Sequence, residues 1–352
     1  MSRSILVVLS FTIIACEPSV IRMHDDDGEI DIYIDMGFEA DTAVDPGVDP
    51  GTDPGTDPGI DPGTDPGTDP GTDPGTDPIT DPGTDPGTGM CDRWRADRAD
   101  LREGSWSGSV SGCVAGDVAS PGRDNALKLV NLFRWMASLP AVTLDGERNR
   151  KAQDCALMMH ANGRLSHTPP TSWSCYTADG AEAAGRSNIG TAPGVQAMDM
   201  YMQDWGNEST MGHRRWILSN SLGPIGQGST SEYSCLWVLY GSGSAGASWT
   251  SWPPPGEFPI QAVTMSWRGL DSTGWTIQSD SIDLGRASGV TVTAGGSGMP
   301  VSFVHLAGGY GSSTAINFIP SGWSSAVGTT YHIEVQGIST SISYDVTMVD
   351  CG

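Results

Sequence analysis

The stretch "MGHRRWILSN", residues 211–220, changes from polar to apolar within a few positions. His213 and two arginines form the polar half, and Trp216, Ile217 and Leu218 form the apolar half. Because polar residues suit a surface and apolar residues suit a core, His213 marks a seam between the two. A histidine at a seam is either a packing residue or one half of a site that is completed elsewhere in the chain.

The 352 residues carry a formal net charge of −24 that is unevenly distributed. Residues 1–90 hold 20 acidic and 2 basic residues, a charge of −18, whereas residues 91–352 hold 22 and 16, a charge of −6. The sequence contains no basic stripe of the kind that binds nucleic acid, so we expect no nucleic-acid partner. The length allows two domains with additional segments.

The chain begins "MSRSILVVLSFTIIAC". The apolar run 5–15 is too short for a permanent membrane span and is typical of a signal peptide. Ala15 directly before Cys16 resembles the bacterial lipobox, which implies cleavage before Cys16 and a lipid on its thiol. An ordinary signal peptide with an incidental cysteine is the alternative. We therefore predict a signal peptide over residues 1–15, a lipid that attaches the protein to a membrane, and a periplasmic or cell-surface location.

Three segments without a large core follow. Residues 16–44 form an acidic spacer, and residues 45–89 repeat the unit Asp-Pro-Gly-Thr with few changes. Proline, glycine and a charge in every fourth position prevent a packed core, so we interpret the repeat as a disordered tether. Calcium binding is disfavoured, because each unit offers one carboxylate and a calcium site needs six to eight oxygens. Residues 90–119 form a small cysteine-containing segment that begins with a short helix.

Beyond Cys16 the chain has an even number of cysteines, which in an exported protein favours disulfides. They are Cys91, Cys113, Cys155, Cys175, Cys235 and Cys351. Sequence cannot choose among the 15 pairings of six cysteines. Our working prediction is 91–113, 155–175 and 235–351, the first two because they close short loops.

Two regions with different patterns make up the remainder, and the fold class that they predict is α+β. Residues 120–248 contain three helices, expected over 123–139, 147–163 and 192–207, and a strand near 232–241. Residues 249–352 begin with a stiff linker, "SWPPPGEFP". Short runs rich in Val, Ile, Thr and Ser follow, from "AVTMSW" at 262–267 to "SISYDVTMV" at 341–349, and predict an antiparallel β-sandwich.

Five histidines of these two regions are candidates for chemistry. His160 lies within the second helix between core-like residues, and we interpret it as structural. His167 and His213 each lie just beyond a predicted helix end, where a side chain can face a cleft. His305 and His332 fall inside strand-like runs with no acidic cluster beside them, and we interpret both as structural.

Several motifs follow one another in residues 122–242. They are Asn131 and Arg134 in a predicted helix, His167 after a glycine-containing turn, "GRSNI", Trp205 in a predicted helix, Gly212 and His213, and the strand opening at residues 225–228. Their order resembles the CAP superfamily, whose members carry N-x-x-R, a histidine, Gly-Glu-Asn, a tryptophan, Gly-His and Ile-Gly-x-Gly, and which includes cysteine-rich secretory, antigen 5 and pathogenesis-related proteins. The resemblance implies a CAP-like α-β-α sandwich before the predicted β-sandwich.

The resemblance implies that His167 and His213 face one shallow cleft with acidic residues, where some members bind a divalent metal. This sequence departs from the family at Ser187, which replaces the glutamate. Glu182 could substitute only if its loop bends back, so Glu208 is the better acidic candidate. Residues that the resemblance places along the cleft are Asn188, Ser187, Glu182 and Arg214, the last as a holder of anions. We therefore expect no cofactor, or zinc bound only weakly by His167 and His213.

The function that these features predict is a lipid-anchored extracytoplasmic binding module with a histidine-lined cleft. Its ligand would be a lipid, a cell-wall glycan or a protein. A hydrolase of peptides or wall polymers is the first alternative, with His167, His213 and Glu208 as catalytic candidates and Ser187 or Ser209 as nucleophile. A purely structural surface protein is the second. We expect binding rather than catalysis, because neither serine has a marked acidic partner.

Overall fold

The computed structural model describes residues 20–25, 28–33, 89–266 and 268–352. The predicted signal peptide, Cys16 and nearly all of the Asp-Pro-Gly repeat lie outside these residues. Within the acidic spacer, β1 (Val20–Asp25) pairs antiparallel with β2 (Gly28–Tyr33), where we expected irregular chain. The alternation in "GEIDIY" is the signal for a strand that we missed. No helix in the described part of the chain is long and apolar enough to cross a membrane.

The segment after the repeat begins with helix α1 (Met90–Asp97), as predicted. It buries Trp94 and contacts helix α2. The chain then turns back on itself, and isolated bridges pair Trp106 with Val118 and Ser109 with Val114. This segment therefore packs onto the central region rather than forming a separate domain.

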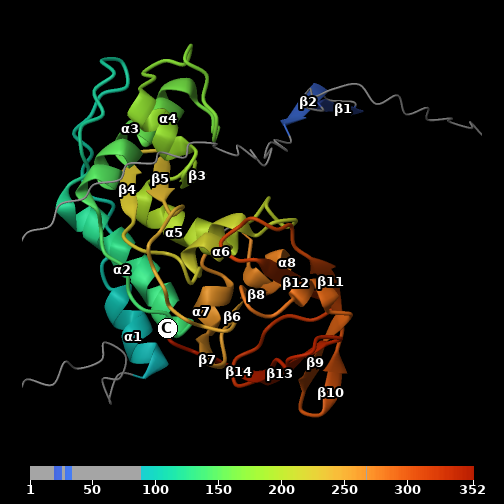
Figure 1. The fold of residues 1–352 in the computed structure, drawn as a ribbon. Coiled ribbons are helices and arrows are strands. Elements are labelled where there is room, and N and C mark those ends of the chain that lie inside the picture. Colours follow the sequence, from blue (N-terminus) through green and yellow to red (C-terminus); the bar gives the residue numbers. More distant parts are fainter. Residues whose placement is uncertain (1–19, 26–27, 34–88, 267) are drawn as a thin grey trace, which may run out of the picture. The chain divides into compact units, whose positions relative to one another are not determined.

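The central region alternates helices with three short strands. Its elements are α2 (Ser120–Met136), α3 (Gly146–Asn162), α4 (Ala178–Ala184), β3 (Ser187–Gly190), α5 (Gly194–Gln203), α6 (Gly212–Ile217), β4 (Gly226–Ser229) and β5 (Ser234–Trp237). The strands form one antiparallel sheet in the order β3-β5-β4 (Figure 1). One apolar cluster joins the sheet to α3 and α4, and another joins it to α2 and α5. Each face of the sheet is therefore covered by helices.

Local sequence explains how α3 is positioned against β4. The Asp145 carboxylate accepts a hydrogen bond from the Arg148 N–H at the start of the helix, and Gly163 ends it with a φ of 64°, as we predicted. In β4, a Cβ on Gly228 would lie 2.1 Å from the backbone nitrogen of Gln153. Glycine in the Ile-Gly-x-Gly motif therefore lets the strand approach the helix backbone.

The C-terminal region, residues 249–352, is built mainly of strands. Its elements are β6 (Thr250–Trp252), β7 (Gly256–Pro259), α7 (Ile260–Val263), α8 (Leu270–Thr273), β8 (Trp275–Ser279), η1 (Leu284–Arg286), β9 (Gly289–Ala294), β10 (Ser297–Met299), β11 (Val301–His305), β12 (Thr314–Pro320), β13 (Thr330–Gln336) and β14 (Ser343–Val349). They form a sheet β10-β9-β13-β14-β7 and a sheet β11-β12-β8-β6. Trp275 and Tyr331 meet edge to face between the sheets, with ring centroids 5.6 Å apart. The predicted α+β class is confirmed.

Two predictions within this region were wrong. The expected linker "SWPPPGEFP" contributes to β6 and β7, and Trp252 within it is buried. The run 262–267, predicted as a strand, begins inside helix α7. Short apolar runs do not distinguish a strand from a turn of helix, and a proline-rich stretch can lie at a sheet edge.

The central and C-terminal regions share one apolar core, which includes Ile217 and Ile277. Buried amides reinforce the seam: Gln203 Nε2 donates to the Ala262 carbonyl and Gln278 Nε2 to the Leu218 carbonyl, each at 2.8 Å. The sequence pattern changes near residue 249, but the two regions on either side of this boundary pack around a shared core.

All six described cysteines form disulfides, but our predicted pairing was wrong at every bond. The bonds are Cys91–Cys351, Cys113–Cys175 and Cys155–Cys235. They span 260, 62 and 80 residues. Short loops misled the prediction, because pairing follows the tertiary neighbours: α3 lies against β5, and α1 lies near the end of the chain.

Candidate functional site

His213 lies on helix α6 and contacts an aspartate that we did not single out. Its Nδ1 is 2.9 Å from Oδ1 of Asp204, whose side chain is fully buried, while 22% of the His213 side chain is exposed. When the ring is protonated, Nδ1 carries a proton and the contact is an ion pair with this carboxylate. The ring also packs against Tyr201 at a centroid distance of 5.0 Å.

Several donors hold the Asp204 carboxylate in place. Asn207 Nδ2 donates to Oδ1 at 2.9 Å, and the backbone N–H of Arg214 donates to Oδ2 at 3.2 Å. Asn207 Nδ2 also lies 3.3 Å from His213 Nδ1, and because an amide nitrogen only donates, Nδ1 accepts this bond when the ring is neutral. Asp204 has a left-handed backbone with a φ of 54° and ends helix α5. An acidic residue at that helix end, nine residues before His213, was the feature of the sequence that could have indicated Asp204 as the partner of His213.

His167 is oriented by a backbone carbonyl instead of a carboxylate. Its Nδ1 lies 2.8 Å from the Ala184 oxygen at the end of α4, so the proton is on Nδ1. Asn188, four residues later, donates through Nδ2 to the His213 carbonyl at 3.0 Å. Both histidines therefore form hydrogen bonds with the segment 184–188. The two residues that they contact, Ala184 and Asn188, are at most about 14 Å apart, the length of four residues of extended chain.

The other predicted cleft residues are engaged in bonds of their own. The Glu208 carboxylate accepts a hydrogen bond from the Gly206 N–H at 3.0 Å, within its own loop. Glu182 forms ion pairs with Lys151 at 2.6 Å and Arg186 at 3.2 Å, and the hydrogen bond from Lys151 lowers the pKa of its carboxyl group. Neither carboxylate has a hydrogen bond or ion pair with a histidine among the described residues.

Ser187 and Asn188 lie on opposite faces of β3, because successive strand residues alternate. Asn188 faces His213, and its carbonyl accepts a hydrogen bond from the Tyr201 hydroxyl at 3.1 Å. Ser187 is buried, and its Oγ has no hydrogen-bond partner in the described part of the chain. Ser187 is therefore not positioned as a nucleophile activated by His213.

Arg214 does not line an open cleft, so that interpretation was wrong. The side chain is fully buried and donates to the carbonyls of Met202 and Gly274 at 2.6 and 2.8 Å. Further bonds go to the Gln203 carbonyl and to the hydroxyls of Thr273 and Thr276. Burial lowers the pKa of Arg214 to about 10. The guanidinium joins the central region to the C-terminal region, because its bonds reach both.

Arg215 repeats this arrangement one position later. It donates to the Thr210 and Ala307 carbonyls and to Ser312, and its guanidinium lies 5.8 Å from the Tyr310 ring. Burial lowers its pKa to about 10 as well. The polar residues of "MGHRRWILSN" therefore lie at an internal seam. Arg214 and Arg215 are buried there, and His213 stays partly exposed.

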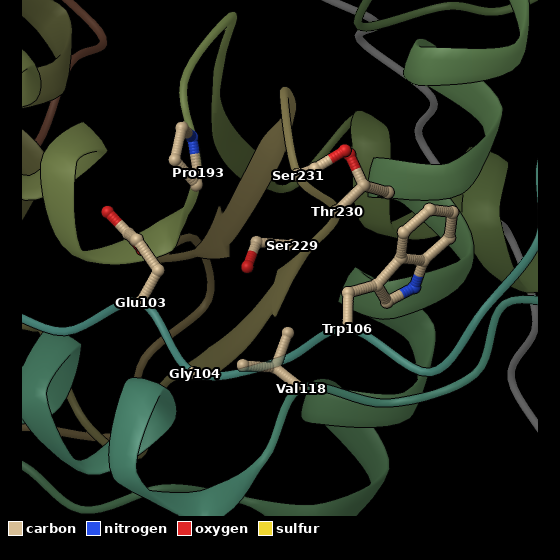
Figure 2. Close-up of a pocket in the computed structure, with 8 residues that line it drawn as sticks. All are labelled: Glu103, Gly104, Trp106, Val118, Pro193, Ser229, Thr230 and Ser231. Atoms are coloured by element: carbon tan, nitrogen blue, oxygen red, sulfur yellow. The ribbon is translucent and has the colours of Figure 1, made fainter.

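A hollow lies elsewhere, between the segment 103–118 and the β4–β5 turn. Its volume is about 280 Å³, and Figure 2 shows Glu103 and Pro193 opposite Trp106 and Thr230. Glu103 accepts hydrogen bonds from the Val195 and Gln196 N–H groups of α5, and burial raises its pKa. None of the predicted site residues lines this hollow.

The metal-binding residues implied by the family are incomplete here. No group of three or more His, Cys, Asp or Glu side chains able to hold a metal occurs within the described ranges. Asp204 binds the Nδ1 side of His213, and Ser187 offers a buried hydroxyl in the glutamate position. Two imidazoles alone do not fit a resident zinc ion, which takes three or four protein ligands.

Residues 127–240 match the model of the cysteine-rich secretory protein family, CAP. Neither a curated protein nor a solved structure matches the chain. The matched residues run from α2 to just beyond β5 and include both histidines of the site. The match supports a CAP domain in this part of the chain, and with three disulfides it indicates an extracellular or exported protein.

Proposed function

We propose that this protein is an exported CAP-domain binding module that captures a polar ligand at the His167–His213 site. The observation that carries the proposal is that the fold holds both imidazoles at Nδ1. The Nδ1 of His167 bonds to the Ala184 carbonyl, and the Nδ1 of His213 lies beside Asp204 and Asn207. Preorganised rings of this kind bind a ligand without first losing side-chain freedom.

The chemistry of the site favours a hydroxylated ligand such as a cell-wall glycan over a lipid or a protein. Its polar side chains include the two imidazoles, which exchange hydrogen bonds with hydroxyls. An acyl chain requires an enclosed apolar cavity, and the two hollows described both contain polar lining residues and measure about 280 and 190 Å³. Binding is favoured over hydrolysis in this cleft, because no serine hydroxyl contacts either ring among the described residues.

A binding assay on the purified full chain tests this proposal. Insoluble peptidoglycan is the probe, and the variants are His167→Ala, His213→Ala and the double variant. We expect the double variant to lose at least about tenfold in affinity, a loss of about 1.4 kcal/mol. His305→Ala is the matched control, because His305 Nε2 contacts the Ala287 carbonyl in the C-terminal region.

Unchanged binding by the folded double variant would refute the histidine site and leave a structural surface protein as the better description. Peptidoglycan turnover that disappears with His213→Ala would instead establish a hydrolase. Denaturation curves of all variants are recorded in parallel, so that loss of binding is separated from loss of fold.

The proposal includes a membrane attachment through Cys16 and a tether formed by the Asp-Pro-Gly repeat. The lipobox-like Ala15–Cys16 pair and the absence of a packed core in the repeat support it. Cys16→Ala should move the protein from the detergent phase to the aqueous phase in a detergent-partition experiment. Detergent partition that is unaffected by the substitution would exclude a lipid at this residue.

A further inference from the structure

A second aspartate–histidine pair lies on the C-terminal region, and a serine extends it. On neighbouring strands β13 and β14 (Figure 1), Nδ1 of His332 is 2.7 Å from Oδ1 of Asp345. Nε2 of the same ring is 3.2 Å from Oγ of Ser343. All three residues are exposed, with 48% of the His332 side chain and 64% of the Asp345 side chain accessible to solvent.

Strand register explains why these three side chains meet. His332 pairs with Asp345, and Glu334 pairs with Ser343, so all four alternate on the same face of the sheet. The Val335 N–H donates to the Ile342 carbonyl, which makes the His332–Asp345 pair a non-hydrogen-bonded one. Side chains approach most closely in such pairs, and Ser343 lies on the adjacent diagonal.

The proton positions follow from the acceptor. Because the Asp345 carboxylate can only accept, Nδ1 carries the proton and Nε2 of the neutral ring accepts from the Ser343 hydroxyl. This is the Ser-His-Asp arrangement of nucleophile, base and orienting carboxylate, which is recognised by geometry and not by sequence position. We propose that Ser343, His332 and Asp345 form a second site that hydrolyses carboxylic esters.

A backbone donor for the developing oxyanion lies beside the nucleophile. The Ile342 carbonyl points to β13, so strand alternation directs the Ser343 N–H to the opposite edge of β14. Strand β7 pairs with β14 only from Val346 onward, so none of the described strands pairs with that edge at Ser343. The serine therefore presents its own N–H near its hydroxyl, which is one of the donors that acyl transfer requires.

The surroundings indicate an ester on an extended, hydroxyl-bearing chain. Around the three residues the face carries Thr291 and Thr293 of β9, Thr330 of β13 and Thr347 of β14, and it is a sheet surface without a described hollow. Such a flat face fits a polymer better than a small molecule that needs enclosure.

The reaction is balanced with water as the only co-reactant. The Ser343 hydroxyl transfers its proton to His332 Nε2 while its oxygen bonds to the ester carbonyl carbon. The ester C–O bond breaks, and the leaving alcohol takes that proton. Water then attacks the acyl-serine through the same base, which releases the carboxylic acid and restores the serine.

The esterase rate of the full chain with 4-nitrophenyl acetate is compared with that of the Ser343→Ala variant. Ser341→Ala is the matched control, because Ser341 is also exposed and lies two residues before Ser343. We expect Ser343→Ala to lower the rate at least about a hundredfold, the lower end of what general acid–base catalysis contributes, and Ser341→Ala to leave it unchanged. A fluorophosphonate should label the wild-type peptide containing Ser343, and mass spectrometry should identify that residue.

A wild-type rate no higher than that of Ser343→Ala, or a label placed on another residue, overturns the proposal. The His167→Ala, His213→Ala double variant should retain the esterase rate, so failure here is distinct from failure of the glycan-binding proposal. All three side chains are exposed, and matching denaturation midpoints confirm that each variant is folded.

Discussion

The two aspartate–histidine pairs have similar Nδ1–Oδ1 distances in opposite environments. Nδ1–Oδ1 distances are 2.9 Å for His213 and Asp204 and 2.7 Å for His332 and Asp345, but the Asp204 side chain is fully buried and 64% of Asp345 is exposed. Water weakens the exposed pair, whereas a buried carboxylate is costly unless several donors satisfy it. The same contact therefore stabilises the fold in the first case and leaves a reactive group accessible in the second.

The largest effect is expected for Arg214→Met, because Arg214 follows His213 and lies in the same buried seam as Asp204. The substitution removes five hydrogen bonds and leaves the Met202, Gln203 and Gly274 carbonyls unpaired inside the seam. We expect the free energy of unfolding to fall by about 4 kcal/mol, as measured by denaturant titration.

Arg286→Met is the matched control for that variant. Its side chain is 78% exposed and pairs only with Asp283, so we expect a change within about 0.5 kcal/mol. Equal losses in the two variants would mean that the seam does not depend on its buried cation.

The next largest effect is expected for Asp204→Asn. The amide keeps the shape of the side chain but loses the charge that the N–H groups of Asn207 and Arg214 stabilise. We expect a loss of about 3 kcal/mol in unfolding free energy, together with weaker peptidoglycan binding because the buried carboxylate no longer pairs with the His213 ring. Calorimetry and the binding assay measure the two effects separately; stability equal to wild type would contradict the role of Asp204.

Much of the fold followed from periodicity, while the partners of the site did not. Helices α2, α3 and α5 of the central region and the short helix α1 were predicted, because apolar spacing and terminal residues such as Gly163 are local signals. The shorter helices α4 and α6 were not. The role of Arg214 was missed, because a charged residue beside a histidine gives no sign of which distant carbonyls will surround it.

The disulfides and the serine illustrate the same limit. Cys91 pairs across 260 residues with Cys351, which no spacing rule indicates. For His332 we saw no acidic cluster in the sequence, yet strand register places Asp345 against its ring. Contacts set by β pairing depend on register, and register depends on which strands meet.

Glu103 provides an intermediate case, because its carboxylate is half-buried and accepts hydrogen bonds from two N–H groups of α5. Burial raises its pKa above 4.5, so its contribution to stability is fully present below about that pH and is lost as pH rises through the folded-state value. Glu103→Gln does not titrate and keeps one acceptor oxygen. We expect it to cost about 1 kcal/mol near pH 4 and less at pH 7, as measured by thermal unfolding at both pH values. A cost that grows with pH would reverse the sign of this argument.

The smallest effect on stability is expected at the exposed end of the comparison, for Asp345→Asn. Exposed cross-strand pairs contribute little, so the free energy of unfolding should change by no more than about 0.5 kcal/mol. The ester hydrolysis proposed for Ser343 should nevertheless fall, because an amide no longer fixes the proton on Nδ1 of His332. A variant that is destabilised as strongly as Asp204→Asn would show that exposure does not separate the two pairs. A variant with unchanged hydrolysis would show that Asp345 does not orient the ring for chemistry.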